Sequence, residues 1–132
     1  MIDLDDVKGI NDGDGHQAGD AVPAETARRL QLIGRAGDTV ARWGGDEFLF
    51  VLPGCSRSAA QRLRARVGRS IAQPIRLGAL SVAVSASVGV AVGRRGDDLN
   101  ELVLQADGAL QAVKASRSAA STRPGLQALA GA

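Results

Sequence analysis

The stretch from residue 42 to residue 48, Arg-Trp-Gly-Gly-Asp-Glu-Phe, joins two glycines to two adjacent carboxylates. β-Branched and apolar residues flank it on both sides, so the sequence predicts a β-hairpin with Gly44 and Gly45 at its tip. Glycines there allow positive φ angles and the close approach of a bulky anion. Asp46 and Glu47 are neighbours on a strand and must point to opposite faces, so only one can face a given site. The alternative interpretation is an acidic, solvated turn.

A second acidic segment lies at the start of the chain, where Lys8 is the single lysine or arginine before Asp20. The apolar start that meets Asp3 predicts a strand end, where α/β folds place ligand groups. A run of aspartates with so little compensation repels itself unless a cation is bound. Oxygen ligands from Asp3, the Leu4 carbonyl and Asp46 suit magnesium, which few protein carboxylates hold while phosphate oxygens complete the octahedron.

Other phosphate and metal motifs fail on spacing. The glycines of the N-terminal segment miss the dinucleotide fingerprint by one residue, and the chain contains no P-loop pattern. An EF-hand that begins at Asp12 has Gln17 where an invariant glycine belongs. The chain has one histidine, His16, and one cysteine, Cys55, which are too few for a zinc site.

Several blocks of residues follow one another along the chain at defined spacings. They are Asp3-Leu4-Asp5-Asp6-x-Lys8, Ile10-Asn11-Asp12-x-x-Gly15-His16-x-x-Gly19-Asp20, Arg35-x-x-Asp38, Arg42-x-Gly44-Gly45-Asp46-Glu47-Phe48, Ser85-x-Ser87-x-Gly89-Val90-Ala91, and Ala106-Asp107-x-Ala109-Leu110 with Lys114. In type, order and spacing these blocks resemble the GGDEF domain of the diguanylate cyclase family, and so many independent matches make chance similarity very improbable.

The resemblance covers residues 1–118, and residues 119–132 are expected to form a flexible tail. It implies an α/β (α+β) architecture: a palm-like, ferredoxin-like nucleotide cyclase fold with a central mixed or antiparallel sheet flanked by helices. The family's N-terminal helix and most of its first strand are expected to be missing from this chain. The arginine of the family's terminal pattern, Arg117, lies one position early.

The activity implied by the resemblance is condensation of two GTP molecules into cyclic di-GMP with release of pyrophosphate. A homodimer is needed, because each domain presents one GTP to the other. Asp3, the Leu4 carbonyl and Asp46 are implied to hold magnesium or manganese, which neutralises charge during in-line attack by a 3′-hydroxyl. The catalytic candidates are Asp46, Glu47 and Lys8. Asp46 ranks as a metal ligand above a general base, because a metal-bound carboxylate is a weak base, and Lys8 is assigned to phosphate oxygens.

The resemblance also implies a set of substrate-binding residues. They are Asn11, His16, Asp20, Gly44, Gly45 and Lys114. Asn11 and Asp20 are assigned to guanine, because adenine lacks the donors that a carboxylate accepts and would leave it unsatisfied. Each has a structural alternative: Asn11 as a loop cap, Asp20 as the N-cap of the following helix, and His16 as a packing residue.

The tetrapeptide from Arg35 to Asp38 stands where the family has its product-inhibition site. The resemblance implies that Arg35 clamps phosphate or guanine through its planar fork and that Asp38 accepts from guanine donors. An ordinary loop salt bridge has the same sequence pattern, so both interpretations stay open.

Length and composition agree with one globular domain. The chain has 132 residues, 45% of them hydrophobic and 2% aromatic, so alanine, valine and leucine must fill the core. A net charge of +2 argues against nucleic-acid binding. One cysteine excludes an internal disulfide, and we see no signal sequence and no apolar run long enough for a membrane, so we expect a cytoplasmic protein.

Apolar periodicity predicts the order of elements. Helices are expected near 20–34, 57–73 and 98–115, the last opened by a capping box of Asp98 and Glu101, and strands near 38–42, 46–52, 76–84 and 85–92. A flexible segment is expected from Ser116 onward.

Three functional hypotheses follow. The first is an active diguanylate cyclase half-site with product inhibition. The second is a catalytically silent receptor that binds cyclic di-GMP through Arg35 and Asp38. The third is an inactive remnant or interaction module, owing to the missing N-terminal elements.

Overall fold

The computed structural model describes residues 1–5 and 16–121, with side chains for 1–5 and 20–120, so the predicted roles of Lys8 and Asn11 lie outside the described residues. The elements are β1 (Ile2–Asp5), α2 (His16–Ile33), β2 (Thr39–Arg42), β3 (Glu47–Val51), α3 (Arg57–Ile71), β4 (Ile75–Leu77), β5 (Leu80–Val82), β6 (Ser85–Val88) and α4 (Leu99–Ser121).

Four strands form the main sheet in the order β2-β3-β1-β6, and every neighbouring pair is antiparallel. β1 is central, with Asp3 opposite Glu47 of β3 on one side and Ser87 of β6 on the other. The structure thus has the expected mixed α and β architecture, with an antiparallel sheet flanked by helices.

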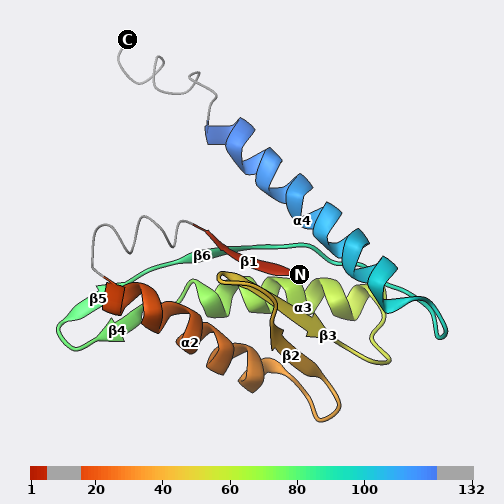
Figure 1. Cartoon of the computed structure of the whole chain (residues 1–132), viewed down its shortest axis with the longest axis horizontal. Helices are drawn as coiled ribbons and strands as arrows, with labels where there is room; N and C mark the ends of the chain where they lie inside the picture. The colour runs from red at the N-terminus through yellow and green to blue at the C-terminus, as the bar shows by residue number, and fades with distance from the viewer. Residues whose placement is uncertain (6–15, 122–132) are drawn as a thin grey trace.

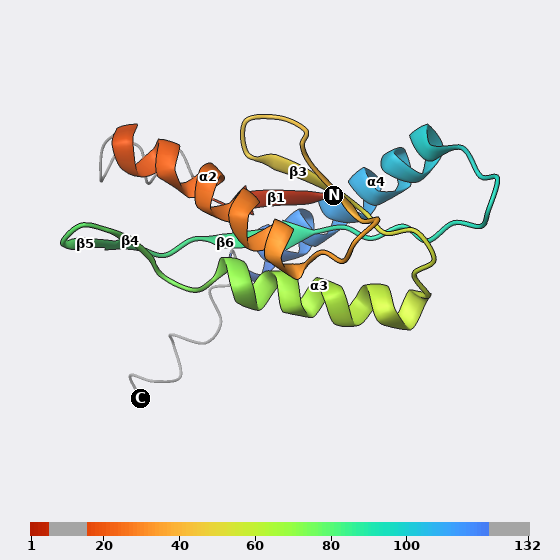
Figure 2. The same ribbon diagram turned by 90° about the horizontal axis from the view of Figure 1, so that it is seen from below.

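Strand alternation gives the sheet two different faces. Ile2, Leu4 and Phe48 belong to the larger core, which also contains residues of α2 and α3 such as Leu30 and Val67. On the opposite face, Met1 packs with residues of α4, namely Ala106 and Leu110. Figures 1 and 2 show the main sheet between the helices. None of the described helices has the length and apolar character needed to cross a membrane.

The region from residue 75 to residue 92 differs from its prediction. The expected strand over 76–84 is a separate two-stranded hairpin of β4 and β5, which turns at Gly78 with a φ of 63°. Its position at the end of the molecule beside the start of α2 is clear in both views (Figures 1 and 2). The next strand, β6, ends at Val88 rather than at residue 92, because its partner β1 begins at Ile2, which lies opposite Val88.

Two helix boundaries also correct the sequence-based expectation. α2 begins at His16, so Asp20 lies inside the helix, exposed, and is not its N-cap. α4 continues to Ser121 and includes the segment from Ser116 that was expected to be flexible. Alanines favour helix there, and Arg117 bonds back to the sheet.

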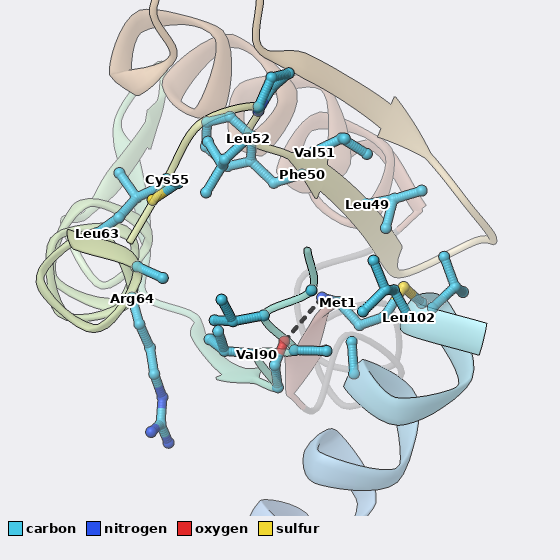
Figure 3. A pocket seen from close by; sticks show the side chains of 18 of the residues that line it. Met1, Leu49, Phe50, Val51, Leu52, Cys55, Leu63, Arg64, Val90 and Leu102 are labelled. Atoms are coloured by element: carbon cyan, nitrogen blue, oxygen red, sulfur yellow. Dashed lines mark hydrogen bonds between the residues drawn. The ribbon is translucent and has the colours of Figure 1, made fainter. Parts of the chain in front are cut away.

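A cavity of about 600 Å³ lies between the end of β3 and the segment after β6. Figure 3 shows the side chains around it: Leu52 after β3, Leu63 of α3, Val90 after β6 and Leu102 of α4. The Arg64 guanidinium is directed away from the cavity. Met1 closes one side, where its ammonium donates to the Gly89 carbonyl at 2.9 Å (Figure 3). Burial lowers the pKa of this ammonium. The cavity is at the Met1 end of β1, away from the hairpin tip that Leu4 contacts.

Candidate active site

The tip of the β2–β3 hairpin is fixed by hydrogen bonds from its own sequence motif. The amides of Trp43 and Gly44 donate to the Glu47 carbonyl at 2.8 and 3.2 Å. The Arg42 guanidinium donates to the carbonyls of Gly44 and Gly45, the shortest distance being 2.7 Å. The predicted position of the two glycines at the tip is therefore confirmed, and Arg42 braces the tip, a role that sequence reasoning missed.

The reason for glycine at the tip differs from the prediction. Among the described glycines, neither Gly44 nor Gly45 has a positive φ. A Cβ built on Gly44 would instead lie 3.0 Å from Oε2 of Glu47. At position 44 glycine therefore provides space for the Glu47 carboxylate.

The first strand and the hairpin bring the predicted acids together. The Leu4 amide donates to the Asp46 carbonyl at 2.9 Å, and Asp3 pairs with Glu47 in the sheet register. Because directly opposed residues on antiparallel strands share a face, Asp3 and Glu47 project to the α4 side. Asp46 precedes β3 and is half-buried.

Lys114 of α4 provides a positive charge next to these acids. It forms an ion pair with Asp3, whose side chain is 12% exposed, whereas the Lys114 side chain is 36% exposed. Hydrogen bonding to Asp3 raises the pKa of Lys114; burial opposes this rise, and the charges of Asp3, Asp5 and Glu47 add to it. The structure thus places Lys114 beside Asp3, one of the predicted metal ligands.

A second polar network lies next to this pair and was not predicted. Asp5 accepts hydrogen bonds from the hydroxyls of Ser85 and Ser87, each at 2.9 Å. Arg117 donates to Asp5 at 2.6 Å and to the Ser87 hydroxyl at 3.2 Å. The two-residue spacing of the serines could have indicated one shared face, but nothing local indicates that Arg117 reaches it.

The residues at the tip include oxygen ligands of the kind that a divalent cation needs. Two carboxylates, Asp3 and Asp46, and the Leu4 carbonyl come from adjacent segments and are the hard oxygen ligands that magnesium prefers. Within the described ranges, no three or more His, Cys, Asp or Glu side chains are grouped to hold a metal ion. The chain's residues therefore fit a cation whose remaining ligands are phosphate oxygens or water.

Arg35 and Asp38 lie apart from this group, in the loop between α2 and β2. The Asp38 carboxylate accepts from the Arg35 amide at 2.8 Å and lies 3.6 Å from Nε of Arg35. The Asp38 side chain is 5% exposed and the Arg35 side chain is 67% exposed. Both residues line a surface depression that also includes Gln31 and Thr39. The loop salt bridge is present, and the Arg35 fork remains accessible to a ligand. The side chain of His16, at the first residue of α2, lies outside the described part of the chain.

Comparison with known proteins identifies the family. A family model described as "Diguanylate cyclase, GGDEF domain" matches residues 1–119. The chain belongs to this family.

Curated relatives and solved structures agree. The bifunctional diguanylate cyclase/cyclic di-GMP phosphodiesterase MucR of Pseudomonas aeruginosa is 37% identical over 115 residues, 86% of this chain and 17% of the relative. Diguanylate cyclase VdcA of Vibrio cholerae is 37% identical over 118 residues, 86% of this chain and 35% of the relative. The chain therefore spans about a third or less of the length of these relatives.

Among solved structures, diguanylate cyclase SiaD of Pseudomonas aeruginosa, in complex with its activator SiaC, is similar with a TM-score of 0.80 and 39% identity. The match covers 87% of this chain and 45% of that one. The GGDEF domain of DgcB from Caulobacter crescentus, in complex with c-di-GMP, has a TM-score of 0.80 and 27% identity over 87% of this chain and 70% of that one. These structures support the expected nucleotide cyclase fold.

Proposed function

We propose that this chain is a diguanylate cyclase half-site, which condenses two GTP molecules into cyclic di-GMP when two copies face each other. The observation that supports the proposal is the backbone contact between β1 and the hairpin tip in a member of this family: the Leu4 amide donates to the Asp46 carbonyl, and Asp3 pairs with Glu47. The reaction is nucleotidyl transfer with release of pyrophosphate, in the cytoplasm.

In this proposal the chain's residues have separate tasks. Asp3, the Leu4 carbonyl and Asp46 hold magnesium or manganese, which supplies charge neutralisation on the triphosphate. Lys8 and Lys114 bind phosphate oxygens, while Gly44 and Gly45 let the ligand approach the backbone of the tip. Glu47 sits opposite Asp3 and adds negative charge beside the cation site.

Guanine recognition is proposed for Asn11, His16 and Asp20. Asp20 is exposed on α2, so its carboxylate is open to a ligand that approaches this helix. A guanine held there satisfies a carboxylate with two donors, whereas adenine leaves it unpaired.

The proposal is tested with Asp46→Asn in a chain fused to a dimerising coiled coil, which raises the concentration of one half-site near the other. We expect cyclic di-GMP synthesis from GTP, followed by chromatography, to be lost, because a hard metal ligand is removed. The thermal unfolding midpoint should change little, since the Asp46 carbonyl that accepts from Leu4 is retained. Synthesis at the unmodified rate would remove Asp46 from the mechanism. No synthesis by the unmodified fusion would favour a silent cyclic di-GMP receptor or an inactive interaction module.

A further inference from the structure

The face of β1 toward α4 changes from apolar to acidic along the strand, and α4 changes with it. Met1 packs against Ala106 and Leu110, whereas the following residues on the same face, Asp3 and Asp5, are acidic. On α4 the facing positions continue at helical spacing through 106, 110, 114 and 117, of which the last two are basic. The apolar residues of α4 therefore face the apolar start of β1, and the basic residues of α4 face its acidic end.

The two basic contacts are built differently. Arg117 bonds to Asp5 and Ser87, and Asp5 is held by both serines of β6, so this contact is a closed network. Within the described residues, the Lys114 ammonium donates its hydrogen bond to Asp3. An ammonium is a compact charge on a flexible stem and exchanges partners easily, while a guanidinium fork fixed by several acceptors does not.

Asp3 cannot be left without a positive partner. Its side chain is only 12% exposed, and Glu47 lies directly opposite. A carboxylate in such surroundings needs a cation or strong donors to offset its desolvation. Lys114 meets this need in the structure, and the predicted divalent cation would meet it at the same carboxylate.

We propose that Lys114 is the resident counter-cation of Asp3 and that binding of a divalent cation at the hairpin tip displaces it, leaving Arg117 on Asp5 to keep α4 on the sheet. This inference rests on the proposed metal role of Asp3. Lys114, with 36% of its side chain exposed, has a path to solvent and becomes available to an anion that arrives with the cation.

The test is a manganese titration without nucleotide, followed by electron paramagnetic resonance, on the full chain. Lys114→Met and Arg117→Met each remove one positive charge from the same end of α4, so they are matched for general electrostatics. We expect Lys114→Met to tighten Mn²⁺ binding about tenfold, the scale of one close charge contact, and Arg117→Met to change it less than about threefold. Lys114→Arg, which keeps a charge with more donors, should not bind more tightly than the unmodified chain. Asp3→Asn should abolish binding.

The second readout is the temperature of thermal unfolding. With a chelator present, Lys114→Met should unfold at a lower temperature than the unmodified chain, and excess Mn²⁺ should restore most of the loss. Unchanged or weaker Mn²⁺ binding by Lys114→Met, or equal tightening by Arg117→Met, would overturn the inference. Neither readout involves turnover, so a chain that passes both but makes no cyclic di-GMP contradicts the proposed function alone.

Discussion

Glu47 is one of the two acids of the hairpin motif, and its carboxylate lies close to Gly44, which has no side chain. A Cβ on Gly44 would lie 3.0 Å from the Glu47 carboxylate, whereas a Cβ on Gly45 would have no neighbour within 4 Å. The two glycines are therefore unequal. The first leaves room for an acid, and the second leaves open space where a ligand can approach the backbone.

A prediction at the residue scale concerns Arg35. Arg35→Ala should relieve product inhibition and leave initial rates nearly unchanged, because it removes an exposed fork outside the proposed GTP site. The lost cyclic di-GMP affinity corresponds to about 1.5–3 kcal/mol if the contact is charge-assisted. Calorimetric titration with cyclic di-GMP measures it.

The control for Arg35 is Arg28→Ala. Arg28 is also an exposed arginine of this region, and it pairs with Glu25 on the same helix. The Arg28→Ala variant should bind cyclic di-GMP with the same affinity as the unmodified chain. If Arg35→Ala also binds with unchanged affinity, the pattern from Arg35 to Asp38 is a loop salt bridge and nothing more.

Individual residues show how far the sequence could predict the site. The hairpin motif has local signals, namely paired glycines between β-forming flanks, and its tip was predicted correctly. The network of Asp5, Ser87 and Arg117 was missed, because it joins residues that are 82 and 30 positions apart. Such contacts depend on the register between a helix and a strand, which no local pattern determines.

At the scale of elements, the approach of α4 to β6 depends on Gly89. A Cβ at this position would lie 2.1 Å from the Ala106 carbonyl oxygen and 2.4 Å from the Leu110 amide nitrogen. Both are backbone atoms of a helix and cannot rotate away. Glycine is therefore required here by close packing, and this packing sets the height of Lys114 above Asp3.

Gly89→Ala should destabilise the chain by about 3 kcal/mol, because α4 must move off the sheet. Gly108→Ala is the matched control, since a Cβ on this helical glycine meets nothing within 4 Å. It should stabilise the chain by about 0.5–1 kcal/mol through helix propensity. Denaturant unfolding measures both. Equal stability of the two variants would show that α4 is not packed this closely.

Arg29 connects α2 to the end of α3. Its guanidinium donates to the carbonyls of Ser70, Gln73 and Pro74 at 2.7 to 3.0 Å, and its side chain is only 12% exposed. These carbonyls follow or end α3, where a helix leaves acceptors unsatisfied. The positive charge also suits the negative end of the helix dipole.

Arg29→Ala should therefore lower the free energy of unfolding by about 2 kcal/mol or more, since several carbonyls lose a charged donor. Arg28→Ala, the adjacent arginine, should have little effect, because its side chain is 60% exposed. Urea unfolding followed by circular dichroism compares them. Similar losses for both arginines would contradict the assigned role of Arg29.

The elements themselves were predicted where periodicity is strong and missed where packing decides. The helix over Arg57–Ile71 was expected within two residues of its end, with Ser56 as its observed N-cap. The strand expected over 76–84 turned at Gly78 instead, and the helix expected to end at 115 continued to Ser121. Neither a turn at one glycine nor a helix extended by a contact to Asp5 has a distinctive local pattern.

At the scale of the whole molecule, the cavity lies in line with the central strand. The register of β1 places the position before Met1 opposite Phe50 of β3 and Val90 after β6. Neighbouring strands are about 4.8 Å apart, so the space between two strands that flank a third accommodates one extended chain. Residues from α3 line one side of the cavity and residues from α4 the other, so both faces of such a chain would be buried.

Addition of four apolar residues before Met1 should therefore stabilise the molecule. A strand buried on both faces favours a continuous apolar run over alternation. The extension also replaces the buried ammonium, whose pKa is lowered by desolvation, with a neutral amide. We expect a gain of about 2 kcal/mol or more, which corresponds to an increase of several degrees in Tm. Differential scanning calorimetry measures it.

Two controls show whether the gain comes from the cavity itself. An extension of four glycine and serine residues removes the same charge but buries little apolar surface, so it should give a much smaller increase in Tm. Leu102→Lys, which places a charge at the lining of the cavity, should reduce the gain from the apolar extension. Amide hydrogen exchange at Phe50 and Ala91 should slow only with the apolar extension, because the alternation of hydrogen bonds between Met1 and Gly89 and between Leu4 and Asp46 directs these two N–H groups toward the added strand. Equal Tm values for the apolar and the polar extensions would show that the space beside β1 does not accept a strand.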